Sequence, residues 1–238
     1  MRRRRRWGLR LASAGLLTLT LWVGYEAWQW PDVTALGRRP PATTAFIEAH
    51  RARERAAGRD DRVERARTPY GAISPHAKRV VLVAEDIRFF SHRGFDLGEM
   101  KKAIEDAVEE GELPRGASTI TQQLAKNLWL SPSRNPLRKV KEAILTWQLE
   151  RALGKRRILE LYLNVVEFGP RIYGLGAASR RYFGKAPADL TEAEAAQLAA
   201  SLPRPTAWHP GVASPAYQRY VASIQRRMAR AEFLWKLI

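Results

Sequence analysis

The chain has 238 residues, of which 45% are hydrophobic and 27% charged, and 41 Lys and Arg against 24 Asp and Glu give it a formal net charge of +17. This composition excludes a disordered chain and a polytopic membrane protein, and the length suits one domain with attachments. The absence of cysteine excludes disulfides and thiolate metal sites. So basic a balance favours an acidic partner, namely nucleic acid, anionic lipid or a phosphate-bearing substrate, with a merely basic surface as the alternative.

The N-terminus has the pattern of a membrane anchor. A basic run from Arg2 to Arg6 precedes a largely apolar stretch over residues 11–30, which is about the length that crosses a bilayer. Because positive charge stays on the cytoplasmic side, we expect a cytoplasmic basic tail over residues 1–10, a transmembrane helix over 11–30 and the rest of the chain outside. A cleavable signal peptide is the alternative, but residues 12–14 lie too early for its small-residue cleavage site.

The remainder of the chain shows helical spacing and no sustained two-residue alternation. We expect a linker and membrane-proximal segment over residues 31–69, with a solvated helix within 43–67, and a mainly α domain over residues 70–238. Two capping boxes, Thr119 with Gln122 and Thr191 with Glu194, mark helix starts. The apolar spacing predicts helices over residues 78–88, 97–110, 119–130, 137–153, 156–164, 191–202 and 215–237.

Two adjacent acids, Glu85 and Asp86, lie near the end of the first helix of this domain, after a Val-rich run. Burial against an apolar wall raises the pKa of a carboxyl group, and a Glu with a raised pKa is suited to act as a base near neutral pH. The alternative is structural: both acids would then form an ionic network with Arg88 and His92.

A segment rich in neutral hydrogen-bonding groups follows at residues 116–127. It combines hydroxyl, amide and ammonium groups, and Gln123, Lys126 and Asn127 share one helix face. Many neutral donors beside a lysine suit sugar hydroxyls and a phosphate. A well-capped surface helix is the alternative, although surface helices usually carry Glu and Lys instead.

A cluster of cations surrounds a further acid. Arg134, Arg138, Lys139 and Lys141 lie close in sequence to Glu142. Such a cluster can hold a pyrophosphate, because arginine offers bidentate donors and lysine a point charge. A solvated basic helix is the alternative.

The last polar motif, at residues 155–164, indicates mostly architecture. Arg156 and Glu160 are expected to pair one helical turn apart, and Asn164 is expected to end the helix. Separately, the apolar run Leu128 to Leu130 is a candidate for membrane contact, with packing in the core as the alternative.

Together these four motifs resemble the peptidoglycan glycosyltransferase domain, a lysozyme-like family that bifunctional penicillin-binding proteins share with monofunctional transglycosylases. The matching stretches are Glu85-Asp-x-x-Phe89-x-x-His92-x-Gly94, Gly116-x-Ser118-Thr-Ile-Thr-Gln-Gln-x-x-Lys126-Asn127, Arg138-Lys-x-Lys-Glu142 and Ile158-Leu-Glu-x-Tyr-Leu-Asn164. They occur in the family's order over about residues 75–210. The resemblance implies a mainly α, lysozyme-like helical domain behind an N-terminal transmembrane helix.

The resemblance also implies a reaction, the polymerisation of lipid II into glycan strands. Glu85 would deprotonate the 4-hydroxyl of the acceptor, which attacks a glycan chain on undecaprenyl pyrophosphate with inversion at the anomeric carbon, and Glu142 would be the second acid near the donor. A divalent metal, Mg²⁺ or Mn²⁺, at the diphosphate is implied by the resemblance alone, since the sequence has no metal-ligand spacing of its own. The implied substrate-binding and pyrophosphate-binding residues are Asp86, Ser118, Thr119, Gln122, Gln123, Lys126, Asn127, Arg134, Lys139 and Asn164.

The implied setting is the bacterial inner membrane, with a single pass and the catalytic domain on the outer side. The implied partners are lipid II, the lipid-linked glycan and membrane lipids, with divisome or elongation proteins as further candidates and no nucleic acid. The transpeptidase motif Ser-x-x-Lys is absent from the sequence, so we expect a monofunctional enzyme that is insensitive to β-lactams.

Two rival functions remain open at the level of sequence. A lytic transglycosylase or lysozyme-like glycan-cleaving enzyme would share the helical fold and the main acid, but its substrate has no phosphate for the cation cluster to hold. A membrane-tethered structural protein would dock on anionic lipid and would depend on its N-terminal arginines more than on Glu85.

Overall fold

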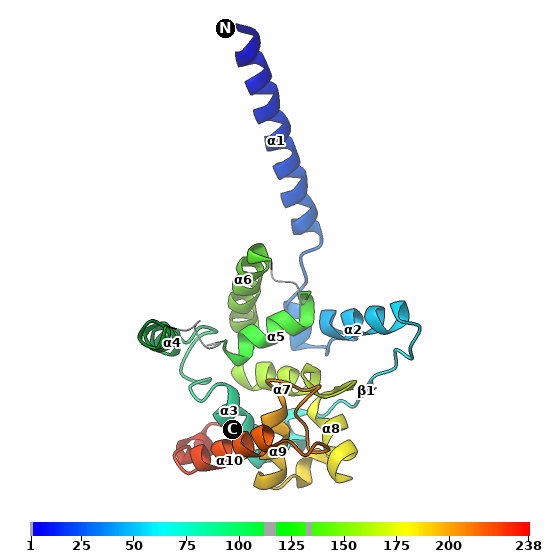
Figure 1. Cartoon of the computed structure of the whole chain (residues 1–238), viewed down its shortest axis with the longest axis vertical. Coiled ribbons are helices and arrows are strands. Elements are labelled where there is room, and N and C mark those ends of the chain that lie inside the picture. Colours follow the sequence, from blue (N-terminus) through cyan, green and yellow to red (C-terminus); the bar gives the residue numbers. More distant parts are fainter. Residues whose placement is uncertain (1, 112–117, 132–134) are drawn as a thin grey trace. The chain divides into compact units, whose positions relative to one another are not determined.

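The computed structural model describes residues 2–111, 118–131 and 135–238, and the chain divides into two units (Figure 1). The first unit, Met1–Asp32, consists mainly of helix α1 (Arg2–Trp28). In the part of the chain that the structure describes, no helix combines the length and the apolar character that crossing a membrane requires. The second unit, Val33–Ile238, is compact.

Helices make up most of the compact unit, so the mainly α fold class is confirmed. Its α-helices are α2 (Ala45–Ala56), α3 (Pro75–Glu85), α4 (Leu97–Glu110), α5 (Ile120–Trp129), α6 (Pro136–Ala152), α7 (Lys155–Val165), α8 (Leu175–Phe183), α9 (Glu192–Ser201) and α10 (Pro215–Met228). Short 3-10 helices lie at η1 (Thr34–Gly37), η2 (Tyr70–Ala72), η3 (Pro187–Asp189) and η4 (Glu232–Lys236). Both capping boxes are present, at Thr119 before α5 and at Thr191 before α9.

Two groups of packed helices form the core. Helix α3 packs against α9 and α10, and α5 packs against α6 and α7 (Figure 1). On α9 the face toward the core is made of small residues such as Ala196 and Ala199, which are fully buried and let α3 approach closely. The two groups meet where α3 ends and α5 begins, since the carboxylate of Asp86 accepts a hydrogen bond from the backbone N–H of Ile120.

A small sheet joins segments that are far apart in sequence. Strand β1 (Glu64–Arg65) runs parallel to β3 (Ile172–Tyr173), which pairs antiparallel with β2 (Glu167–Gly169). Strands of two or three residues are too short to show alternation, so periodicity could not predict them. Gly174 follows β3 with φ +86°, and a Cβ there would lie 2.8 Å from the carbonyl oxygen of Asn164, so both backbone conformation and space require glycine.

Several helix bounds differ from the prediction. Helix α3 ends at Glu85 and not at Arg88, because Asp86 has φ −165° and its carboxylate is held by hydrogen bonds outside the helix. The helix expected over residues 215–237 ends at Met228, and η4 follows it. Helix α8 was not predicted, and the solvated helix within residues 43–67 is the shorter α2, capped by Thr44.

Two residues of the candidate membrane-contact run belong to the core, and Trp129 between them is partly exposed. Leu128 and Leu130 are each 4% exposed. The alternative of core packing is therefore confirmed for both residues.

Candidate active site

Glu85 is the last residue of α3, and it borders a cavity of about 200 Å³. The preceding residues Val80 to Val83 are buried, so the apolar side of α3 brings the carboxyl group to the edge of the core. Four of the predicted site residues, Glu85, Asp86, Ser118 and Thr119, share this cavity. It is lined by Val83, Ala84, Glu85, Asp86, Ile87, Asp96, Glu99, Ser118, Thr119 and Arg227.

The environment of Glu85 favours its protonated form. Burial raises the pKa of the Glu85 carboxyl group above its ordinary value, and the hydrogen bond from Gln123 and the positive charges of Lys126 and Arg227 offset that effect only in part. Such a carboxyl group, when ionised, is a stronger base than an exposed glutamate. The environment therefore suits a group that accepts a proton from a hydroxyl.

Gln123 orients this carboxyl group. Its Nε2 donates a hydrogen bond of 2.8 Å to Oε2 of Glu85, and its Oε1 accepts one of 2.9 Å from the hydroxyl of Tyr162. Tyr162 is fully buried in α7, so its hydroxyl is held in place by packing. Three helices thus combine to aim one carboxyl group.

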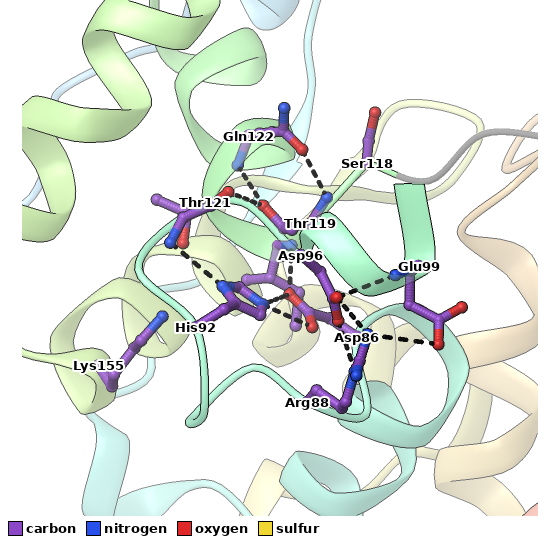
Figure 2. A network of polar contacts seen from close by, with 12 residues as sticks. Asp86, Arg88, His92, Asp96, Glu99, Ser118, Thr119, Thr121, Gln122 and Lys155 are labelled. Carbon is purple, nitrogen blue, oxygen red and sulfur yellow. Dashed lines mark hydrogen bonds and ion pairs between the residues drawn. The ribbon is translucent and has the colours of Figure 1, made fainter. Parts of the chain in front are cut away.

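Asp86 has a different role from its neighbour. Figure 2 shows its carboxylate between His92 and the start of α5, with His92 Nε2 at 3.0 Å and the N–H of Ile120 also at 3.0 Å. The N–H of Gly94 donates to His92 Nδ1 at 3.1 Å, so the proton of a neutral ring lies on Nε2 and is donated to Asp86. The expected ionic network is therefore split: Asp86 and His92 form a structural clamp, and Glu85 stays outside it.

Arg88 completes the network on the other side (Figure 2). It pairs with both carboxylate oxygens of Asp96, with Nε at 2.8 Å from Oδ2, and Asp96 also accepts from the backbone N–H of Glu99 to cap α4. Ligand atoms of Asp86, His92 and Asp96 lie within 4.8 Å of one another, the arrangement of a candidate cation site. The N–H groups of Ile120 and Gly94 and the guanidinium of Arg88 already form hydrogen bonds to these three side chains.

We therefore find that these side chains do not fit the divalent metal that the resemblance implies. The carboxylate oxygens face N–H donors of the protein, and an arginine occupies the side from which Asp96 would bind a cation. Around Glu142 the described partners are cations as well, and a set of cations is unsuited to holding Mg²⁺ or Mn²⁺.

The predicted site residues at the start of α5 mainly hold the backbone in place through hydrogen bonds. The hydroxyl of Thr119 accepts a hydrogen bond from the N–H of Gln122 and donates one of 2.7 Å to the carbonyl of Gly94. The side-chain Oε1 of Gln122 in turn accepts a hydrogen bond from the N–H of Thr119. Gly94 has φ +88°, and a Cβ there would lie 2.8 Å from Cγ2 of Thr146, so glycine is required for the turn to pass beneath α6. Asn127 donates to the carbonyl of Gln123 in the same helix.

A second buried acid, Glu142, shares the electrostatic partner Lys126 with Glu85. Glu142 on α6 is 2% exposed and pairs with Arg138 at 3.3 Å and with Lys139. Lys126 of α5 interacts with both Glu142 and Glu85, and burial with the charges of nearby Arg138 and Lys139 lowers its pKa. Lys126 thus lies within electrostatic reach of Glu85, Lys139 and Glu142. Arg134 lies outside the described residues.

Asn164 lies elsewhere. Its side chain is 8% exposed and exchanges two hydrogen bonds with the backbone of Thr68, at 2.7 and 2.8 Å, and it borders a separate cavity with Pro40 and Arg67. It is not among the residues that line the cavity of Glu85. Nearby, Glu160 pairs with Arg157 at 2.6 Å, so its predicted pairing with Arg156 was wrong.

Two residues next to Glu85 were missed by sequence reasoning. Arg227 of α10 lines the cavity, and it donates a hydrogen bond of 3.0 Å to the carbonyl of Val83 on α3. It lies 142 positions from Glu85 in the sequence. Tyr162 lies among aliphatic residues on the buried face of α7. A tyrosine at an otherwise aliphatic buried position was the available signal, because a buried hydroxyl requires a partner.

Comparison with known proteins decides the family. A family model described as Transglycosylase matches residues 52–229. The chain belongs to the transglycosylase family. The resemblance read from the four motifs is thereby confirmed, and the matched range contains every candidate residue of the site.

Relatives of this transglycosylase carry a more specific name. A protein of Thiobacillus denitrificans is 44% identical over 94% of this chain and 95% of its own length. Proteins of Aromatoleum aromaticum and Methylobacillus flagellatus are 46% and 40% identical, over 83% and 91% of this chain and 86% and 95% of their own lengths. Each is called a biosynthetic peptidoglycan transglycosylase.

Proposed function

We propose that this protein is a peptidoglycan glycosyltransferase that polymerises lipid II into glycan strands and releases undecaprenyl pyrophosphate. The observation that carries the proposal is the position of Glu85, a carboxyl group with a raised pKa at the edge of a cavity. Lys126 interacts electrostatically with Glu85 and with a second acid, Glu142, which is paired with cations. The names of its relatives support the same substrate class.

The chemistry follows from these groups. Glu85 takes the proton of the acceptor's 4-hydroxyl group while the oxygen of that hydroxyl group forms a bond to the anomeric carbon of the donor. The bond from that carbon to the pyrophosphate oxygen breaks, so a single displacement inverts the centre. Negative charge develops on the leaving group, and Lys126 and Lys139 are placed beside Glu142 to neutralise it, with Arg134 as a further candidate.

The remaining predicted site residues divide between contact and support. Ser118 borders the cavity and can reach substrate, whereas Asp86, Thr119, Gln122, Gln123 and Asn127 position the elements that carry Glu85 and Lys126. Transpeptidation is not part of the proposal, since the serine motif for it is absent from the sequence.

We assign the protein to the bacterial envelope, with the N-terminal segment as its anchor in the inner membrane. The uncharged run after Arg10 and the flanking arginines support an anchor with the catalytic unit outside. Membrane lipids are then direct partners, and divisome or elongation proteins are the protein partners to test.

Glycan cleavage is the rival function, and one experiment separates the two. The full-length protein is incubated with lipid II, and separately with preformed glycan strands, next to a Glu85→Gln variant and a Glu109→Gln control on the exposed side of α4. We expect polymer from wild type and control, and a loss of at least about 100-fold in Glu85→Gln. Retained polymerisation in Glu85→Gln would refute the base assignment, and shortening of preformed strands by wild type would favour the lytic function.

A further inference from the structure

Helix α6 presents an apolar stripe that the core does not cover. Leu137, Val140, Ile144 and Trp147 recur at intervals of three and four residues and therefore share one face. Their exposed fractions are 58%, 58%, 42% and 51%. Large apolar side chains gathered on one exposed face mark a binding surface more often than a solvated one.

The stripe ends at a basic cavity. Trp147, its last member, lines a cavity of about 710 Å³ together with Arg93, Arg151 and Lys155. The guanidinium of Arg151 lies over the Trp147 ring, 4.8 Å from its centre. This arrangement places an aromatic ring at the boundary between apolar and cationic groups, where tryptophan is typical of a membrane interface.

The positive charge of this cavity is not neutralised by the protein. Glu150 is the acid among the lining residues, and it accepts from Thr121 at 2.5 Å and from Lys155 at 2.8 Å. Within the described ranges, Arg93 and Arg151 have no carboxylate partner, and both are exposed. The cavity therefore offers an anion two guanidinium groups that no described carboxylate neutralises.

We propose that this surface of α6 binds an anionic phospholipid, with the phosphate in the basic cavity and an acyl chain along the stripe. The stripe spans eleven residues of helix from Leu137 to Trp147, whose ten rises give about 15 Å, or about half the hydrocarbon thickness of a bilayer. A soluble phosphate would leave the stripe uncovered, and a zwitterionic lipid would bring its own ammonium group against the arginines of the cavity. The site is separate from the chemistry assigned to Glu85 and does not depend on it.

The test measures lipid retention by the full-length protein in detergent, using native mass spectrometry with phosphatidylglycerol and, in parallel, phosphatidylcholine. We expect wild type to retain phosphatidylglycerol in preference to phosphatidylcholine. Replacing both cavity arginines, Arg93→Gln with Arg151→Gln, should weaken that retention roughly 30-fold, as expected for two lost charge contacts. The matched control Arg180→Gln with Arg219→Gln removes the same charge from two exposed arginines elsewhere and should bind like wild type.

A second variant tests the apolar half of the site. Val140→Ser with Ile144→Ser keeps both arginines and should also weaken retention of phosphatidylglycerol. Undiminished binding by the arginine variant would overturn the proposal. Equal retention of phosphatidylcholine, or full displacement of the lipid by inorganic phosphate, would overturn its commitment to an anionic phospholipid. Because every variant keeps the N-terminal arginines and Glu85, failure here leaves the proposed glycosyltransfer untouched.

Discussion

The hydroxyl of Tyr162 donates a hydrogen bond of 2.9 Å to Oε1 of Gln123, and this bond determines which end of the amide faces Glu85. With Oε1 occupied, Nε2 is directed to the Glu85 carboxyl group at 2.8 Å. An amide turned the other way would place oxygen against oxygen and disfavour the ionised base. Tyr162 is thus a positioning residue that acts through Gln123.

Replacing Tyr162 with Phe should lower kcat/KM roughly tenfold and move its acid limb to higher pH, because the amide loses the bond that orients it. The measurement is the pH profile of lipid II polymerisation. Tyr217→Phe is the matched control, since that buried hydroxyl donates to the carbonyl of Gln197 and not to the site. A loss of rate with an unchanged profile would contradict the positioning role.

Wild-type activity should itself depend on pH in a defined direction. The base acts in its ionised form, and burial raises the pKa of Glu85 above that of an ordinary glutamate, so kcat/KM should rise with pH through that raised value. Initial rates between about pH 4 and 8 at constant ionic strength measure the pH at which the acid limb of the kcat/KM profile lies. An acid limb at the position of an exposed glutamate would show that burial does not govern the catalytic group.

Asn164→Ala should cost stability and leave the chemistry largely intact. The side chain joins α7 to the backbone of Thr68 and to the carbonyl of Glu160, and the substitution leaves these buried groups without partners. We expect the free energy of unfolding to fall by about 1–3 kcal/mol, as measured by denaturant titration. A large drop in kcat/KM of the still-folded variant would instead assign Asn164 to the substrate.

Glu167 in β2 should make stability depend on pH. Burial raises its pKa to about 7 from the ordinary value of 4.5, against the smaller opposing effects of Arg53 and the Arg171 backbone. A raised folded-state pKa means that the folded protein holds its proton where the unfolded chain loses it. The stabilisation is therefore present below about pH 4.5 and lost as the pH rises through about 7.

Unfolding curves of wild type and Glu167→Gln across that range test this linkage. Relative to the variant, wild type should lose roughly 1–3 kcal/mol between about pH 4.5 and 8, with the larger figure an upper bound because the side chain is only partly buried. Parallel curves for the two proteins would show that Glu167 is solvated at neutral pH.

Local sequence signals predicted the parts of the fold that depend on local forces. The capping boxes at Thr119 and Thr191 lie where the sequence predicts them, since both partners of each box are three residues apart. Helix α4 likewise has its predicted bounds, between the cap of Asp96 and the left-handed Gly111. Short-range patterns carry this information fully.

Features of the fold that depend on long-range contacts could not be predicted from the sequence. The end of α3 depends on the hydrogen bonds of Asp86 to His92 and Ile120, and the sheet pairs Glu64 with Ile172 across 108 positions. The arrival of Arg227 beside Glu85 depends on how α10 packs against α3. The motifs therefore named the candidate residues, whereas the division of these residues between contact and support required knowledge of their partners in the fold.

In the proposed reaction, Lys126 would couple proton transfer to departure of the leaving group. While Glu85 is ionised, the ammonium group is attracted both by it and by Glu142. Once Glu85 has taken the acceptor's proton, that attraction disappears, and the full charge of Lys126 becomes available to the departing diphosphate. In the proposed reaction, proton transfer to Glu85 would therefore strengthen the electrostatic stabilisation of the leaving diphosphate by Lys126 as the glycosidic bond forms.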